Sequence, residues 1–139
     1  MMHLTIVSLD REIFSQEIGF VVLEAKDGQV GIYPNHAPLL SVLKPGLIRV
    51  HLSDKENPEI FFISGGVLEM FDNKATILAD TVERSEELDE EKVLQEKELA
   101  LREKQKHQSH LYQDRDMFYN DLQVLLAKIE AVRFIRKKY

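Results

Sequence analysis

The sequence of 139 residues contains no cysteine and no tryptophan. Without cysteine, the chain cannot form a disulfide scaffold, a thiol nucleophile, a Cys-x-x-Cys redox site or a zinc site with thiolate ligands. Basic residues do not predominate, because 18 Lys and Arg stand against 24 Asp and Glu, which gives a net charge of −6. An acidic balance argues against a protein that binds nucleic acid through a generally basic surface.

Long apolar runs and an N-terminal targeting pattern are missing as well. No apolar stretch approaches the roughly 20 residues that a helix needs to cross a bilayer. The first residues, Met1-Met2-His3-Leu4, resemble neither an Arg-rich transit peptide nor a signal sequence with a charged and then an apolar part. We therefore expect a soluble chain in the cytosol or facing a matrix.

The common catalytic and nucleotide-binding motifs are absent too. The sequence has no GxxxxGK[ST], GxGxxG, GxSxG or HExxH pattern. His107 and His110 are three residues apart, but no carboxylate or third histidine stands at ligand spacing, so a surface loop is favoured over a metal site. His36 could act in catalysis only beside a carboxylate or hydroxyl, and no such partner is evident. We expect no enzymatic activity, no cofactor and no metal.

Glycine and proline are confined to one part of the chain. All 6 Gly and all 4 Pro lie at or before Gly66, and none follows. Because these residues mark turns and are scarce inside helices, the first part turns often and the last part runs uninterrupted. With the charge pattern, this predicts two domains, residues 1–84 and 85–139.

The first part is typical of β structure. Short apolar or alternating segments are separated by turn signals such as Asp27-Gly28 and Pro45-Gly46, and this spacing predicts an all-β sandwich or barrel. The expected strand segments are residues 3–7, 18–22, 47–52, 60–63, 67–71 and 75–79.

The second part predicts two helices. The acidic segment 85–89 offers two helix starts, and good helix formers continue from it to Lys106. After a break at 107–110, a second helix is expected from about Asp114 to Arg136. Its apolar stripe steps by 4, 3, 4 and 3 residues through Phe118, Leu122, Leu125, Ile129 and Val132. Two such helices can pack as an antiparallel hairpin.

The charges of this hairpin are separated along the chain. Residues 85–103 carry three basic and eight acidic side chains, whereas residues 128–139 carry five basic and one acidic. Four cations near the end form a basic tip, which is either a solvated helix end that complements the helix dipole or a docking surface for an acidic partner. These cations are Arg133, Arg136, Lys137 and Lys138.

Five segments in order resemble the epsilon subunit of the F-type ATP synthase. Residues 28–40 resemble the family's GELGILPGHAPLL segment, and residues 44–49 its LKPG-[IV]-R motif. Residues 64–69 resemble SGGFLEV, residues 78–84 resemble LADTAER, and Leu88-Asp89-Glu90-Glu91 resembles the start of the first C-terminal helix. The resemblance covers nearly the whole chain.

The resemblance implies an α+β, mainly β fold with an N-terminal β-sandwich followed by a C-terminal antiparallel two-helix hairpin. It implies a non-catalytic rotor subunit in the central stalk of a proton-translocating ATP synthase. The sandwich would contact the gamma subunit and the c-subunit ring, through Gln29, Tyr33, Asn35, His36 and Pro38. The extended hairpin would reach the alpha and beta subunits and restrain ATP hydrolysis, with the basic tip as its inhibitory end.

Several positions depart from the family pattern. Gln29 replaces an acidic residue, so a charged contact with the c ring is expected to be missing. Asn35 replaces a glycine, and asparagine tolerates positive φ better than most residues, so the turn can survive. The ATP-responsive motif [IL]DxxRA is degenerate, because Lys92 stands for its arginine after Leu88 and Asp89.

Two other functions stay open from the residues alone. One is a stand-alone sandwich adaptor with a helical arm, which would never associate with a gamma subunit. The other is a small hydrolase or isomerase that uses His36. For the favoured function, the resemblance and the missing transit pattern together imply the cytoplasmic face of a bacterial plasma membrane, with a thylakoid membrane as the alternative. Attachment would be peripheral, through the complex only.

We predict that ATP binds this chain weakly or not at all. Lys92 offers a point charge in place of the planar arginine fork, and Ala127 and Ala131 stand where ATP-responsive members carry two arginines. Each charge-assisted contact contributes about 1.5–3 kcal/mol, so these losses cost several decades of affinity. Isothermal titration of the isolated chain should detect no binding at micromolar ATP, and a micromolar Kd would contradict the prediction.

Overall fold

The structure, a computed structural model, describes residues 1–54, 56–106 and 112–138. The chain divides into two compact units, Met1–Ser85 and Glu86–Tyr139. Strands make up the first unit and two α-helices the second, which confirms the predicted fold class. His107 and His110, at the predicted break between the helices, lie outside the described residues.

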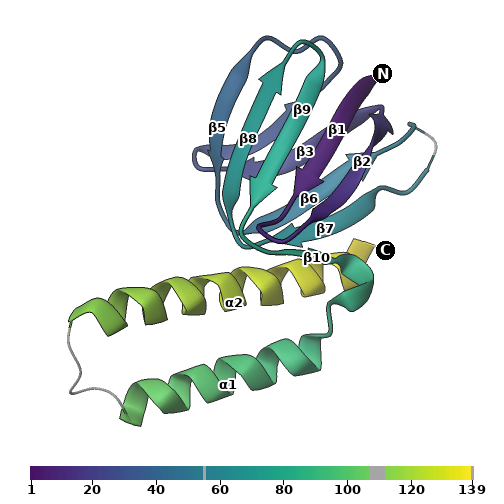
Figure 1. Ribbon diagram of the computed structural model, residues 1–139. Helices are drawn as coiled ribbons and strands as arrows, with labels where there is room; N and C mark the ends of the chain where they lie inside the picture. The colour runs from purple at the N-terminus through teal and green to yellow at the C-terminus, as the bar shows by residue number, and fades with distance from the viewer. Residues whose placement is uncertain (55, 107–111, 139) are drawn as a thin grey trace. The chain divides into compact units, whose positions relative to one another are not determined.

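The first unit is a sandwich of two five-stranded layers (Figure 1). One layer has the order β5-β8-β9-β1-β2, and the other has β10-β7-β6-β3 with β4 beside β3; they join where Ala25 of β3 pairs with Leu43 of β5. The pairing of β1 with β9 is parallel, and the other pairings are antiparallel. The strands are β1 (Met2–Val7), β2 (Glu12–Ile18), β3 (Phe20–Ala25), β4 (Gly28–Ile32), β5 (Leu39–Leu43), β6 (Gly46–His51), β7 (Glu59–Ile63), β8 (Gly66–Phe71), β9 (Lys74–Ala79) and β10 (Val82–Arg84).

Alternate side chains of both layers form one apolar core. β1 buries Leu4 and Ile6 completely while the residues between them face outward, as the two-residue period of a strand requires. At one side of this core the rings of Phe14 and Phe61 meet edge to face, with centroids 5.7 Å apart.

The Ser64-Gly65-Gly66 motif needs its glycines because the backbone at Gly66 lies very close to the backbone at Leu78 and Ala79. Gly65 has φ +117°, which favours glycine, and a Cβ on Gly66 would lie 2.1 Å from the carbonyl oxygen of Leu78. Ser64 N also donates to Thr81 O at 3.3 Å, and Thr81 N donates to Ser64 Oγ at 3.1 Å. These bonds connect the segment 64–69 to the segment 78–84, so two of the family-like motifs are held against each other.

The prediction of one continuous strand over residues 18–22, with Ile18, Phe20 and Val22 on the same face, is wrong. Gly19 separates β2 from β3 and donates its N–H to His51 O at 2.8 Å. Ile18 is therefore buried in the core, whereas Phe20 and Val22 are only half-buried and Val21 faces the core instead. A break of one residue moves the following side chains to the opposite face of the sheet.

Both ends of the segment 28–40 belong to strands. Residues 28–32 form β4, and Leu39 already belongs to β5. The turn before it consists of Lys26 and Asp27, one residue earlier than predicted. β2, β4, β5 and β10 were not predicted. β2 is largely polar, β5 has apolar side chains at both phases, and β10 has only three residues, so none of these three shows clear alternation.

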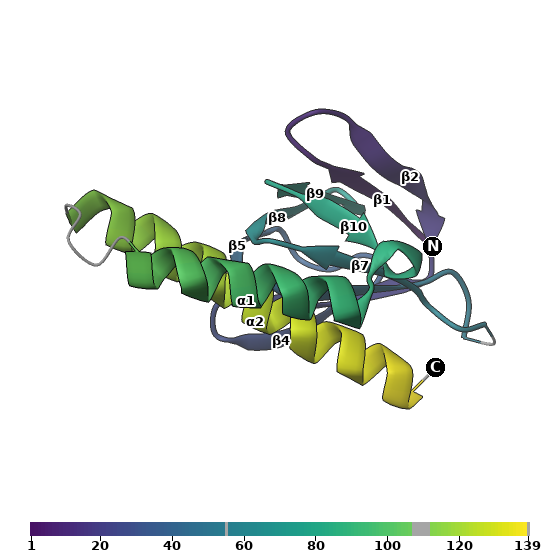
Figure 2. The same cartoon turned by 90° about the horizontal axis from the view of Figure 1, so that it is seen from below.

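The second unit is an antiparallel helical hairpin. A short 3₁₀ turn (Ser85–Glu87) precedes α1 (Glu90–Lys106), and α2 (Tyr112–Lys138) returns beside it (Figure 1, Figure 2). Asp89 caps the start of α1, because its carboxylate accepts from Glu91 N at 3.0 Å and its carbonyl accepts from Val93 N at 3.0 Å. α2 extends two residues beyond each predicted end.

The apolar stripe of α2 is confirmed where side chains are described. Ile129 and Val132 are buried and Leu122 and Leu125 half-buried, whereas the side chain of Phe118 lies outside the described part. On α1, Arg102 pairs with Glu98 one turn earlier at 2.6 Å. Neither helix, over its described residues, contains a window long and apolar enough to cross a membrane.

We predict that Gly66→Ala destabilises the sandwich by at least about 2 kcal/mol, because the new methyl group must push β8 away from β9. Gly31→Ala is the matched control, since its Cβ would meet only the Tyr33 ring at 3.4 Å. Urea unfolding of both variants measures the difference. Equal midpoints for the two variants would contradict this account of the motif.

Candidate functional site

One end of the sandwich is organised around the turn between β4 and β5. Asn35 has φ 62°, so the prediction that asparagine preserves this turn is confirmed. Its N–H donates to Asn73 Oδ1 at 2.8 Å. The turn is thereby fixed to the β8–β9 hairpin, which lies 38 residues further along the chain.

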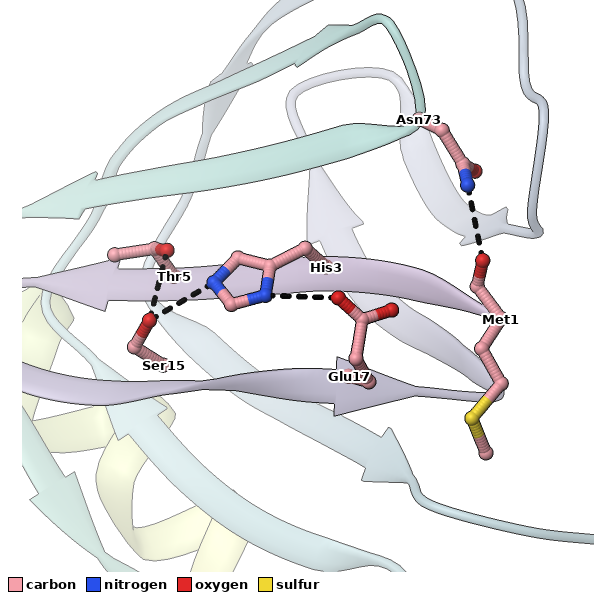
Figure 3. Close-up of polar contacts among 6 residues, drawn as sticks. All are labelled: Met1, His3, Thr5, Ser15, Glu17 and Asn73. Carbon is pink, nitrogen blue, oxygen red and sulfur yellow. Dashed lines mark hydrogen bonds and ion pairs between the residues drawn. The ribbon is translucent and has the colours of Figure 1, made fainter.

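Asn73 connects three segments at this end. It forms a two-residue hairpin turn with Asp72, and both have positive φ, 60° and 49°, as the tight turn between β8 and β9 requires. Its side-chain amide donates to Met1 O at 2.9 Å (Figure 3). Its backbone carbonyl accepts from His3 N at 3.2 Å. The start of β1, the 34–36 turn and the β8–β9 hairpin are therefore held together by one side chain and its backbone.

His36 serves this turn through backbone contacts. Its N–H donates to Tyr33 O at 3.2 Å, and its Nδ1 lies 2.8 Å from Ala37 O, which requires the proton on Nδ1. The catalytic alternative needs a carboxylate or hydroxyl at the imidazole. Among the residues that the structure describes, none is hydrogen-bonded to it.

Three rings stack beside the turn. Phe20 lies between Tyr33 and His51, with centroid distances of 4.9 Å and 4.2 Å and nearly parallel planes. Burial, and then the charge of Arg49, lower the pKa of His51, and Asp54 opposes the shift only in part. The half-exposed Tyr33 ring is thus supported from below by an aromatic column.

The predicted contact residues divide between two places. Tyr33, Asn35 and His36 share the turn, and Pro38 is exposed just before β5. Gln29 is exposed near the start of β4 and pairs in register with Glu24. It lies about 13 Å along the strand from Tyr33, so the structure does not bring it into the same group.

The outer surface of β5, β8 and β9 is unusually apolar. Val42, Val67 and Leu78 lie directly opposite one another across the three strands and point outward. Leu40 is 73% exposed and Phe71 64% exposed on the same surface. We call these five residues the apolar face. Glu69 lies on the same surface, opposite Leu40 and between Val67 and Phe71, so one carboxylate interrupts the apolar face. Exposed apolar patches with polar residues at their edges are typical of interaction sites.

The outer surface of β1 and β2, in the same layer, is polar. His3 Nδ1 lies 3.1 Å from Glu17 Oε1, and His3 Nε2 lies 2.9 Å from Ser15 Oγ (Figure 3). Thr5 Oγ1 continues the group at 3.4 Å from the same hydroxyl. These side chains satisfy one another in water-accessible positions, so the apolar face stops before β1.

The apolar face was not predicted from the sequence. Its signal was the near-continuous apolar run of β5, Leu39–Leu43, together with the outward Val67 and Phe71 of β8 and Leu78 of β9. Strands that are covered on both faces have near-continuous apolar runs, whereas strands with one solvated face alternate apolar and polar residues. The run in β5 therefore indicates that a partner covers its outer face.

The degenerate nucleotide motif lies where the hairpin begins. Asp89 caps α1, Leu88 is half-buried before it, and Lys92 is exposed on the first turn. On α2, Ala131 is buried and Ala127 half-buried. The one acidic residue of this motif is therefore used as a helix cap.

The basic tip is partly engaged within the hairpin. Arg133 Nε lies 3.2 Å from Glu90 Oε1, and Arg136 pairs with Glu90 Oε2. Lys137 is exposed, and the side chain of Lys138 is outside the described part. The contact of Glu90 with the basic tip was not predicted from the sequence, although the acidic start of α1 and the basic end of α2 must meet in an antiparallel hairpin.

Over the described residues, no three histidines or carboxylates gather as a metal-binding group.

Comparisons with known proteins agree with this architecture. Residues 1–85 match the family described as ATP synthase, Delta/Epsilon chain, beta-sandwich domain. The ATP synthase epsilon chain of Polaromonas naphthalenivorans is 38% identical over 98% of this chain and 96% of the relative, and that of Nitrosococcus oceani is 37% identical over 99% and 96%. The chain belongs to the ATP synthase epsilon-chain family. The predicted family is therefore confirmed.

A solved structure extends the likeness of the epsilon-family fold over both units. A chain in the Euglena gracilis mitochondrial ATP synthase, solved as OSCP/F1/c-ring, covers 93% of this chain with a TM-score of 0.77. The superposed part of that structure covers 79% of its own chain, at 24% sequence identity. At this identity the comparison establishes the fold alone.

Proposed function

We propose that this epsilon-family chain is a non-catalytic rotor subunit of the central stalk, and that its sandwich binds the gamma subunit through the apolar face. The observation that carries the proposal is the exposure of that face. Leu40, Val42 and Phe71 are each more than half exposed on a rigid sheet, and a partner that covers them removes this apolar area from water.

The side on which gamma docks follows from the contrast between the polar β1–β2 surface and the apolar face of the same layer. The β1–β2 surface already satisfies its polar groups and would lose hydration on burial without gaining new bonds. Burial of Val42, Val67 and Leu78 has no such cost, because these side chains carry no polar atoms. Glu69, on the same face opposite Leu40, would have to be paired by the partner or stay hydrated. Gamma is therefore expected on the side of β5 and β8, with the edge of the interface near β9.

For the c ring we propose the end of the sandwich that carries Tyr33, Asn35, His36 and Pro38. Asn73 fixes the backbone of this turn and Phe20 supports the Tyr33 ring, so the end can bind a partner with little loss of conformational entropy. Gln29, on the opposite part of β4, would contribute a separate contact rather than join this group.

For the hairpin we propose a restraint on ATP hydrolysis. The 27 residues of α2 form a rod about 40 Å long, with Arg133, Arg136, Lys137 and Lys138 near its far end. In an extended hairpin these cations would meet acidic surfaces of the alpha and beta subunits. The complex would hold the chain peripherally at the cytoplasmic face of a bacterial plasma membrane, or at a thylakoid membrane.

A single charge on the apolar face tests gamma binding. We expect Leu40→Lys to weaken binding of the full chain to purified gamma at least tenfold, because the ammonium must be buried against an apolar partner. Ser15→Lys adds the same charge to the exposed β1–β2 surface and should change the Kd less than twofold. The truncated chain 1–84 should bind gamma as the full chain does. Equal effects of the two lysines, or a folded truncated chain that does not bind, would contradict the proposal.

Deletion of residues 117–139 tests the restraint. We expect ATP hydrolysis by the assembled complex to rise while assembly is retained, because the sandwich carries the binding surfaces. Replacing Arg133, Arg136, Lys137 and Lys138 by alanine should give part of this rise, most clearly at low salt. Lys92→Ala removes a cation from the other helix and should have no effect. If hydrolysis is the same with and without residues 117–139, the hairpin does not restrain it.

A further inference from the structure

Glu90 uses both oxygens of its carboxylate to hold the far end of the other helix. Oε1 pairs with Arg133 and Oε2 with Arg136, and these arginines lie three residues apart on one face of α2. The Glu90 side chain is only 19% exposed, whereas both arginines are largely exposed. One shielded anion therefore holds two cations of the basic tip.

The antiparallel arrangement favours this group on electrostatic grounds. Glu90 is the first residue of α1, where the helix dipole favours an anion, and the two arginines lie near the C-terminal end of α2, where it favours cations. Glu91 occupies the same first turn but is exposed, and among the described residues it makes no ion pair with α2. Glu90 and Glu91 therefore lie in the same favourable field of the α1 helix dipole, but only Glu90 forms ion pairs with α2 among the described residues.

α1 contributes little buried apolar surface to the hairpin. Val93 is 3% exposed, whereas Leu94, Leu99 and Leu101 of α1 remain exposed. On α2, Ile129, Ala131 and Val132 are buried as well. The ion pairs of the partly shielded Glu90 add to this small apolar contact at the open end of the hairpin.

We propose that Glu90 is an electrostatic latch that keeps the hairpin closed and withholds Arg133 and Arg136 from an acidic partner surface. Glu90 Oε1 and Oε2 occupy the guanidinium groups that such a surface would need, so the two contacts compete. Loss of the Glu90 charge shifts the population toward the open hairpin. Only the consequence for hydrolysis rests on the function proposed above, because the latch itself is a contact within the hairpin.

The latch can be measured in the full chain without partners. The sequence has no cysteine, so Gln95→Cys and Gln123→Cys, both at exposed positions, give one label on each helix for distance measurement by electron spin resonance. We expect Glu90→Gln to raise the ratio of open to closed hairpin about fivefold, and Glu91→Gln to change it less than twofold. Circular dichroism checks that both variants keep their helices.

Salt gives a second readout in the same labelled chains. Raising NaCl from 0.05 to 0.5 M should open the hairpin of the unsubstituted chain, because the arginines are solvent-exposed and screened. It should have much less effect on Glu90→Gln, which has already lost the charge. Equal label distances for Glu90→Gln and Glu91→Gln at both salt concentrations would overturn the latch.

Hydrolysis by the assembled complex separates the latch from the proposed restraint. With Glu90→Gln we expect hydrolysis to fall at least twofold relative to Glu91→Gln, because more hairpins are open. If the labels show opening but hydrolysis is unchanged, the latch is supported and the restraint by the hairpin is refuted. If the labels show no opening, the latch is refuted whatever hydrolysis does.

Discussion

The close approach of β8 to β9 at Gly66 determines the arrangement of the layer that carries the apolar face. Gly66 pairs with Ala79, and from this pair the register places Leu68 and Ile77 in the core and Val67 and Leu78 outside. A slip by one residue would exchange these two sets. A side chain at Gly66 would collide with the backbone of Leu78, so the glycine protects both the core and the surface that we propose for gamma.

The two units are stabilised by different interactions, and this difference suits different tasks. The sandwich has a continuous apolar core and an end fixed by the hydrogen bonds of Asn73. The hairpin has thin apolar contact and a charged contact at Glu90. In the proposed rotor subunit, a rigid sandwich can keep constant contacts during rotation, whereas a hairpin held partly by charges can open for a modest free energy.

The sequence predicted the fold class, the stripe of α2 and the positive φ of Asn35, because each depends on local periodicity or on one residue's conformational range. It did not predict the break at Gly19, because Ile18, Phe20 and Val22 alternate in the sequence although the strand is interrupted between the first two. β5 was missed because a strand apolar on both faces has no period of two. The Glu90 contact was missed because it joins residues 43 positions apart, and only the antiparallel pairing of two helices brings them together.

The central claim is that the apolar face, and not the polar surface of β1 and β2, is covered in the assembled enzyme. Hydroxyl-radical footprinting of the free chain and of the assembled complex measures this directly, because oxidation of a side chain reports its access to water. The account predicts that oxidation of Leu40 and Phe71 falls at least tenfold on assembly, while that of His3 stays within twofold. Protection of His3 with Leu40 and Phe71 still oxidised would contradict it.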